Sequence, residues 1–187
     1  MTATPSLNIF LIGPMGSGKS AVGRQLAKQL HLAFYDSDAE IELRTGVNIP
    51  YIFEREGEAG FREREREVID SLTHLHNVVI ATGGGAILLP QNRESLSSLG
   101  LVVYLRASVQ QQLERTRHGK HRPLLYTDDP ETRLRELMAF RAPLYESLAN
   151  IIVDTDGRQV RAVADEIVQR ANAFREASSQ SSESNVH

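Results

Sequence analysis

The sequence predicts an α/β fold, a three-layer sandwich in which helices cover both faces of a five-stranded parallel sheet. Short apolar runs alternate along the chain with longer segments suited to helices, and this alternation is typical of parallel sheets. The runs are continuously apolar instead of alternating with polar residues, as expected for strands that are covered on both faces. A glycine-rich turn joins the first run to the first expected helix.

The expected elements follow this alternation in order. Strands are expected at residues 9–12, 33–35, 78–81, 101–105 and 151–153, and helices at residues 19–30, 60–76, 108–117, 130–147 and 159–175. The stretch from residue 117 to residue 130 contains glycine, two prolines and several charges, so we interpret it as a mobile loop. Residues 176–187 are rich in Ser, Gln, Asn and Glu, which predicts a disordered polar tail after a single domain spanning residues 1–175.

Composition excludes several classes of function. Hydrophobic residues make up 41% and charged residues 24%, and the formal net charge of −3 gives no overall field toward nucleic acid or anionic membranes. The chain has no cysteine, which excludes disulfides, zinc–thiolate sites and a cysteine nucleophile. The first apolar run is too short to span a membrane, and no signal-peptide pattern surrounds it. We therefore expect a cytoplasmic protein that binds neither nucleic acid nor membrane.

The glycine-rich turn at residues 13–20 reads Gly-Pro-Met-Gly-Ser-Gly-Lys-Ser and matches the pattern G-x-x-x-x-G-K-[ST] between a strand and a helix. Glycines let the backbone curl so that successive N–H groups face phosphate oxygens, and the helix N-terminus adds partial positive charge. Lys19 can reach the β- and γ-phosphates, and the Ser20 hydroxyl can bind Mg²⁺. A glycine-rich connector with a chance lysine is the alternative, but the strand–turn–helix context favours nucleotide binding.

Asp36 and Asp38 stand at the end of the second expected strand. In an open parallel sheet the carboxyl ends of the strands face the ligand crevice. One aspartate could therefore lie near Mg²⁺ and the other near an acceptor hydroxyl. Capping of the following helix is the alternative, and it would explain only one of the two.

The charged run at residues 60–67 contains a second candidate pair. Glu65 falls on the same helical stripe as apolar residues, and Arg62 lies one turn before it. An ion pair drawn toward the interior is costly unless further partners hold it, and a substrate carboxylate suits the fork of an Arg62 guanidinium. The other charges of the run are better interpreted as surface residues.

Three consecutive glycines, Gly83, Gly84 and Gly85, follow the third expected strand and permit a close approach of backbone to ligand. A flexible turn is the alternative. No Walker-B carboxylate occurs there, so Mg²⁺ would depend on Ser20 and Asp36 together with phosphate oxygens and water. The six histidines show no metal-ligand spacing.

Two further arginines lie in or beyond the expected loop. The segment around Arg122 is interpreted as a lid over residues 117–128, in which Arg122 stabilises charge on the transferring phosphoryl group. Arg141, followed by Ala-Pro-Leu-Tyr145, could complete a two-pronged carboxylate clamp. The alternatives are a surface arginine for the first and a helix-stop motif for the second.

Taken together, these motifs resemble those of the shikimate kinase family from about residue 9 to about residue 170. The resemblance rests on six motifs in the family's order and approximate spacing: residues 13–20, Asp36-Ser-Asp38, Phe61-Arg62-x-x-Glu65, Gly83-Gly-Gly85, Arg122-Pro-Leu-Leu and Arg141-Ala-Pro-Leu-Tyr145. It implies a fold of the nucleoside-monophosphate-kinase type, with a substrate-binding helical region at about residues 37–76. It also implies phosphorylation of the 3-hydroxyl of shikimate by ATP, in the biosynthesis of aromatic amino acids.

The resemblance also implies roles for individual residues. ATP phosphates would bind to Gly16, Ser17, Gly18, Lys19, Ser20 and Ala21, with Mg²⁺ on Ser20 and, through water, near Asp36. Asp38 would hold the ring hydroxyls and accept the proton of the attacking 3-hydroxyl. Arg62, Gly84 and Arg141 would bind shikimate, with Glu65 orienting Arg62. Arg122 would act from the lid, and Arg115 and Arg158 match adenine-side positions.

Two alternatives remain open from the sequence. Another small-molecule P-loop kinase, such as a gluconate kinase, would share the phosphate loop and lid but should lack the combination of Arg62, Arg141 and Asp38. A non-catalytic nucleotide-binding relative should have lost Lys19, Asp38 or Arg122, and this chain retains all three. We expect a monomer whose partners are the small molecules ATP and shikimate.

Overall fold

The structure, a computed structural model, describes residues 7–116 and 129–183, with only the backbone described for residues 178–183. Its centre is a five-stranded parallel sheet with the strand order β2-β3-β1-β4-β5. The predicted sheet is thereby confirmed, and each strand lies within one residue of its predicted bounds. The strands are β1 (Ile9–Ile12), β2 (Ala33–Asp36), β3 (Val78–Ala81), β4 (Leu101–Arg106) and β5 (Ile151–Asp154).

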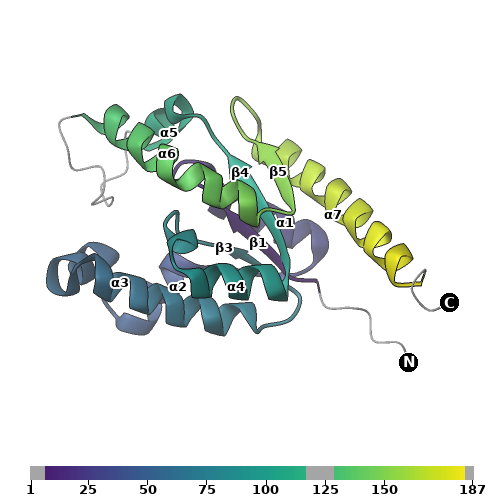
Figure 1. Cartoon of the computed structure of the whole chain (residues 1–187), viewed down its shortest axis with the longest axis horizontal. Coiled ribbons are helices and arrows are strands. Elements are labelled where there is room, and N and C mark those ends of the chain that lie inside the picture. The colour runs from purple at the N-terminus through teal and green to yellow at the C-terminus, as the bar shows by residue number, and fades with distance from the viewer. Residues whose placement is uncertain (1–6, 117–128, 184–187) are drawn as a thin grey trace.

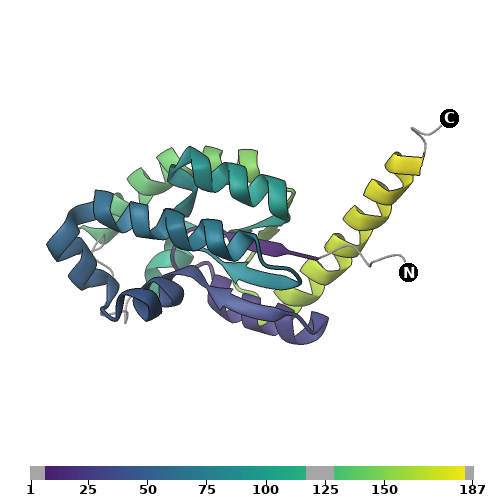
Figure 2. The same cartoon turned by 90° about the horizontal axis from the view of Figure 1, so that it is seen from below.

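Helices cover both faces of this sheet. Figure 1 shows their arrangement, and Figure 2 shows the sheet between a layer with α3, α4 and α6 and a layer with α1 and α7. Their bounds are α1 (Lys19–Leu30), α2 (Ser37–Thr45), α3 (Ile49–Thr73), the 3₁₀ turn η1 (Ala86–Leu88), α4 (Pro90–Leu99), α5 (Val109–Thr116), α6 (Pro130–Leu148) and α7 (Val160–Glu183).

The two layers divide the core into two clusters because alternate residues of each strand face opposite sides of the sheet. In β1, Phe10 and Ile12 pack with buried residues of α3, α4 and α6, whereas Ile9 and Leu11 pack with those of α1 and α7. All four of these strand residues are fully buried. This accounts for the continuously apolar runs in the sequence.

The region after β2 is built by local signals. The Asp36 side chain caps α2, and Gly46, in a left-handed conformation, ends it. Asn48 caps α3, which has a proline in its first turn and is broken by a kink at Gly57, where φ is 70° and ψ is −174°. The kink divides α3 into two helical segments, so the helix predicted from residue 60 corresponds to the segment after Gly57, and the segment that starts at Ile49 was not predicted.

The prediction that disorder begins at residue 176 is wrong, because α7 continues to Glu183. Residues 176–183 contain no glycine or proline to end a helix, and extending an existing helix is much easier than starting one. The last turns of α7 project beyond the rest of the molecule (Figure 2). Residues 184–187 lie outside the described part of the chain. Among the described helices, none has both the length and the apolar character that a membrane crossing needs.

Candidate active site

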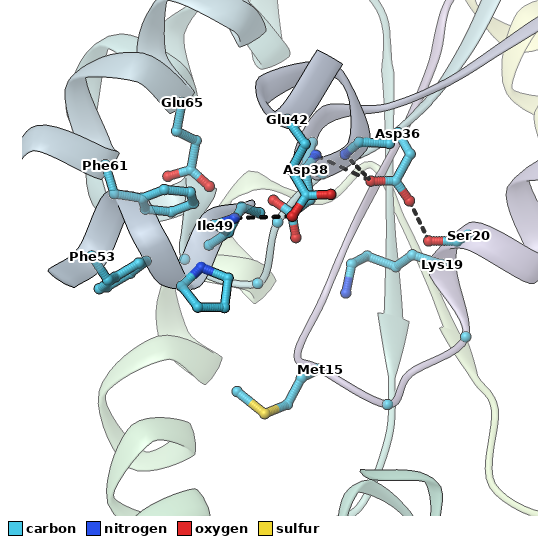
Figure 3. Close-up of a pocket in the computed structure, with 18 of the residues that line it drawn as sticks. Met15, Lys19, Ser20, Asp36, Asp38, Glu42, Ile49, Phe53, Phe61 and Glu65 are labelled. Carbon is cyan, nitrogen blue, oxygen red and sulfur yellow. Dashed lines mark hydrogen bonds between the residues drawn. The ribbon is translucent and has the colours of Figure 1, made fainter. Parts of the chain in front are cut away.

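A cavity of about 590 Å³ lies at the carboxyl ends of β1, β2 and β3. Its walls come from the loop after β1, the start of α1, the end of β2, α2, α3 and the glycine turn after β3, with side chains from α5 and α6 (Figure 3). Most of the predicted site residues line it: Gly16, Gly18, Lys19, Ser20, Ala21, Asp36, Asp38, Arg62, Glu65, Gly83, Gly84, Gly85, Arg115 and Arg141.

The phosphate loop has the backbone that its glycines predict. Gly16 and Gly18 have φ values of 73° and 90°, in the left-handed region that other residues rarely adopt. Among the described residues no side chain caps α1 at Gly18, an arrangement that suits anion binding at a helix N-terminus. The Lys19 ammonium donates to the carbonyl oxygens of Gly13 at 2.8 Å and Pro14 at 2.7 Å. The loop is therefore curled around its own cation.

Asp36 caps the helix that follows it, and its other carboxylate oxygen faces the Ser20 hydroxyl. Its Oδ1 accepts hydrogen bonds from the amides of Asp38 at 3.1 Å and Ala39 at 3.3 Å, which makes it the cap of α2. Its Oδ2 accepts a hydrogen bond from the Ser20 hydroxyl, at the start of α1. A hydroxyl and a carboxylate placed together in this way are the hard oxygen donors that Mg²⁺ prefers. The described residues hold no cluster of three His, Asp or Glu side chains able to bind a metal, so other ligands would have to complete such a site.

Asp38 does not cap α2, and its carboxyl group lies in a buried environment among other charged groups. Its Oδ1 is buried and accepts no hydrogen bond from the described residues. Burial, reinforced by the nearby charges of Glu65 and Asp36, raises the pKa of Asp38 to about 7, although Lys19 and Arg62 act in the opposite direction. The group can thus gain or lose a proton near neutral pH.

Arg62 and Glu65 form the buried ion pair that the helical stripe predicted. Arg62 Nη1 lies 2.7 Å from Glu65 Oε2, and Arg62 Nη2 donates to Glu58 at 3.1 Å. Glu65 is fully buried, and burial raises its pKa, whereas the charges of Arg62 and Arg141 act to lower it. Two polar atoms of the pair, Arg62 Nε and Glu65 Oε1, remain without a hydrogen bond to the described residues.

Arg141 enters the same cavity from α6. It is only 5% exposed, and its Nε also lacks a hydrogen-bond partner among the described residues. The helix-stop interpretation of this segment is wrong, because α6 continues past Pro143 to Leu148. Two buried guanidinium groups from different elements therefore line the same cavity as Asp38.

The glycine triplet is required by close packing. A Cβ at Gly83 would lie 2.7 Å from both Asp38 Oδ1 and Glu65 Oε1, and a Cβ at Gly85 would overlap the Arg62 guanidinium. The Gly83 amide donates to the Ser37 hydroxyl at 2.9 Å, which ties the turn to the start of α2. These glycines thus let the backbone pass directly beneath the charged side chains.

One wall of the cavity is apolar, and sequence reasoning did not predict it. Phe53 and Phe61 lie with ring centroids 4.7 Å apart, beside Ile49 and opposite Met15 (Figure 3). Phe61 was recognised only as a member of the apolar stripe. The helix turn that supplies Ile49 and Phe53 precedes the predicted start of this helix, and Asn48-x-Pro50 was the signal that could have located it.

One predicted residue, Arg115, has an additional contact, and three others are not among the described residues that line the cavity. Arg115 lines the cavity and braces the phosphate loop, since its Nη1 donates to the Gly16 carbonyl at 2.9 Å. Arg158 does not line the cavity; it pairs with Glu166 at 2.7 Å. Ser17, within the loop, is fully buried. Arg122, with the whole predicted lid, lies outside the described residues.

The fold and the cavity together define a P-loop kinase, in which the phosphate loop and a set of carboxylates and arginines line one cavity. A family model described as shikimate kinase matches residues 15–172. The chain belongs to the shikimate kinase family.

Relatives with this name match most of the chain. The shikimate kinase of Halorhodospira halophila is 59% identical over 89% of this chain and 93% of its own length, and that of Pseudoalteromonas atlantica is 55% identical over 88% and 96%. Among solved structures, shikimate kinase from Acinetobacter baumannii in complex with shikimate has a TM-score of 0.89 and 48% identity, covering 91% of this chain and 95% of that one. The Aquifex aeolicus enzyme has a TM-score of 0.79 and 37% identity, with coverage of 90% and 98%.

Proposed function

We propose that this protein transfers the γ-phosphoryl group of ATP to the 3-hydroxyl of shikimate, giving shikimate 3-phosphate and ADP. The observation that carries the proposal is the set of unpartnered polar atoms beside the phosphate loop. Arg62 Nε and Arg141 Nε can donate to a carboxylate, and Asp38 Oδ1 can accept from a hydroxyl. A small carboxylate that also bears hydroxyl groups satisfies all three.

The phosphate loop would hold ATP in the orientation that transfer needs. Its amides and the open N-terminus of α1 bind the phosphates, and Lys19 exchanges its loop carbonyls for phosphate oxygens. Ser20 and Asp36 fit Mg²⁺ because their oxygens already face one another. When bound there, Mg²⁺ would neutralise charge that develops on the phosphate oxygens.

Asp38 would act on the acceptor hydroxyl. With its pKa near 7, an appreciable fraction of the carboxyl is ionised at neutral pH and can accept a proton. The hydroxyl oxygen forms its bond to the γ-phosphorus as the bond to the β-phosphate oxygen breaks, and the hydroxyl proton passes to Asp38. Arg62 and Arg141 would hold the carboxylate of shikimate, Glu65 would fix Arg62, and Gly83, Gly84 and Gly85 would supply backbone contacts.

The remaining assignments rest on the family. We propose that Arg122 acts from a lid at residues 117–128, and that Arg115 and Arg158 bind on the adenine side. We propose that the enzyme is a monomer. We further propose that it acts in the cytoplasm.

The decisive experiment measures ADP release from ATP and Mg²⁺ by the purified full chain. Shikimate is compared with gluconate, quinate and nucleoside monophosphates as acceptors. We expect turnover with shikimate far above that with any other acceptor. Preferential turnover with gluconate would indicate the sugar-acid kinase alternative, and ATP binding without turnover of any acceptor would indicate a non-catalytic relative.

A further inference from the structure

Tyr145 connects two walls of the proposed substrate site, although nothing above gives it a role. It lies on α6 one turn after Arg141, it is fully buried, and its hydroxyl donates a hydrogen bond to the carbonyl oxygen of Gly84. Its ring stacks on that of Tyr104, with centroids 4.9 Å apart and an interplanar angle of 22°. The ring is therefore held in the core while the hydroxyl reaches the glycine turn.

The accepting carbonyl belongs to the peptide unit between Gly84 and Gly85. The carbonyl of Gly84 and the amide of Gly85 form one planar trans peptide, so the two groups point in opposite directions. Glycines on both sides allow such a unit to rotate with little steric resistance. A hydrogen bond from Tyr145 holds the carbonyl toward α6 and directs the Gly85 amide away from α6.

The Gly85 amide takes no part in the hydrogen bonds that hold the turn together in the described part of the chain. The neighbouring groups of the turn are engaged, since the Ala86 amide donates to the Gly83 carbonyl and the Gly83 amide donates to Ser37. The amides of Gly84 and Gly85 donate to none of the described residues, and both glycines line the cavity. Their direction therefore matters for a ligand and not for the stability of the turn.

The tyrosine hydroxyl is suited to a permanent bond. Burial raises the pKa of Tyr145 above its ordinary value, although the charge of Arg141 acts to lower it, so the hydroxyl keeps its proton and donates. A phenylalanine would fill the same space and stack on Tyr104 equally well. The hydroxyl itself is thus the feature that needs an explanation.

We propose that Tyr145 is a positioning residue of the substrate site: its hydroxyl locks the Gly84–Gly85 peptide and thereby sets the direction of these amides relative to Arg141. Because Arg141 and Tyr145 share one face of α6, the same bond also fixes the guanidinium against the glycine turn. The ligand that benefits is the carboxylate held between them. This inference rests on the proposed function.

The test compares Tyr145→Phe with Tyr104→Phe in the full chain. Tyr104 supplies a matched control because it belongs to the same stacked pair but lines a separate cavity with Arg106, Met138 and Glu146. Tyr145→Phe removes the bond to the Gly84 carbonyl and the hydroxyl's hydrogen bond with Arg141, both of which belong to the proposed lock. Loss of one neutral hydrogen bond corresponds to about a three- to tenfold rise in the dissociation constant for shikimate, so we expect at least this rise by calorimetry without nucleotide. We expect this rise in Tyr145→Phe alone, with the KM for ATP unchanged in both variants.

Two further measurements separate positioning from general loosening of the fold. The methyl ester of shikimate, which lacks the carboxylate charge, should bind wild type and Tyr145→Phe with similar, low affinity. In wild type labelled with ¹⁵N-glycine, the Gly85 amide resonance should move when shikimate is added, and this readout remains if Tyr145→Phe does not fold. An unmoved Gly85 resonance, an unchanged affinity for shikimate in Tyr145→Phe, or equal weakening of shikimate and ATP would each overturn the proposal. Failure of the proposed function would instead be seen in wild type, as absent turnover with shikimate.

Discussion

The carboxyl groups of Asp38 and Glu65 lie close together, and the charge of Glu65 helps to raise the pKa of Asp38. This leads to a prediction about the pH dependence of catalysis. If ionised Asp38 accepts the proton of the acceptor hydroxyl, kcat/KM for shikimate should fall as this carboxylate becomes protonated. With a pKa of about 7 for Asp38, the fall should have its midpoint near pH 7 and approach tenfold per pH unit on the acid side. Replacing Glu65 by glutamine removes one of the charges that raise this pKa, so the acid limb should move to lower pH.

The distance between the two carboxyl groups sets the size of this shift in the pH midpoint. Asp38 Oδ1 and Glu65 Oε1 each lie 2.7 Å from the position that a Cβ on Gly83 would take, so the two oxygens are at most twice that distance, about 5.4 Å, apart. At an effective dielectric constant of about 20, two unit charges at this separation repel by roughly 3 kcal/mol, equivalent to about two pKa units. The Arg62 guanidinium, 2.7 Å from Glu65, offsets part of this repulsion. We therefore expect the midpoint to fall by about one pH unit in Glu65→Gln.

The assay is the initial rate at limiting shikimate and saturating ATP and Mg²⁺, from about pH 5.5 to about pH 8.5. Glu63→Gln is the matched control, because Glu63 lies on the same helix but is exposed and pairs with Arg66. Its profile should coincide with that of wild type. A lower maximum in Glu65→Gln with an unmoved midpoint would refute the electrostatic coupling and leave Glu65 only the task of orienting Arg62.

Three substitutions test the other parts of the site. Lys19→Ala should lower turnover by about a hundredfold or more while the circular dichroism spectrum is retained, and near-normal turnover would contradict the phosphate-loop assignment. Arg62→Lys keeps the charge but loses the planar fork, so the dissociation constant for shikimate should rise roughly ten- to hundredfold by calorimetry; a loss confined to ATP would contradict the carboxylate clamp. Gly83→Ala would press a methyl group against Asp38 and Glu65, so kcat/KM for shikimate should fall together with the thermal midpoint; a variant as active as wild type would show that the cavity wall yields.

The elements that could be predicted from sequence are those with a strong, simple pattern. Five continuous apolar runs located the strands because both faces of a parallel sheet are buried. α4 (Pro90–Leu99) was missed, and only Asn92 and Leu96 of this helix are buried, too few to produce a clear period. The tail gave the opposite error, since its polar composition hid a helix that simply continues α7.

In the site, the charged and glycine motifs could be predicted from the sequence, but the structural role of each residue within them could not. The sequence places Asp36 and Asp38 one residue apart without saying which of them caps the helix, and only the backbone geometry assigns the cap to Asp36. The apolar wall of Phe53 and Phe61 was equally hidden, because an aromatic residue in an amphipathic helix is more often core than ligand contact. Their position across the cavity follows from the kink at Gly57, which no periodicity reveals.

What distinguishes this charged cluster from a structural ion pair is the pattern of its incomplete bonding. Arg62 satisfies both terminal nitrogens with carboxylates of its own helix, yet its Nε remains without a partner among the described residues, as does Nε of Arg141. Burying a donor in this way costs about 1–3 kcal/mol per group, and more where the group is charged. A network selected for stability alone would close these bonds or replace the charges with apolar side chains. Donors on two arginines and an open acceptor on Asp38, all facing one cavity, therefore match a ligand that is anionic at one end and hydroxylated at the other.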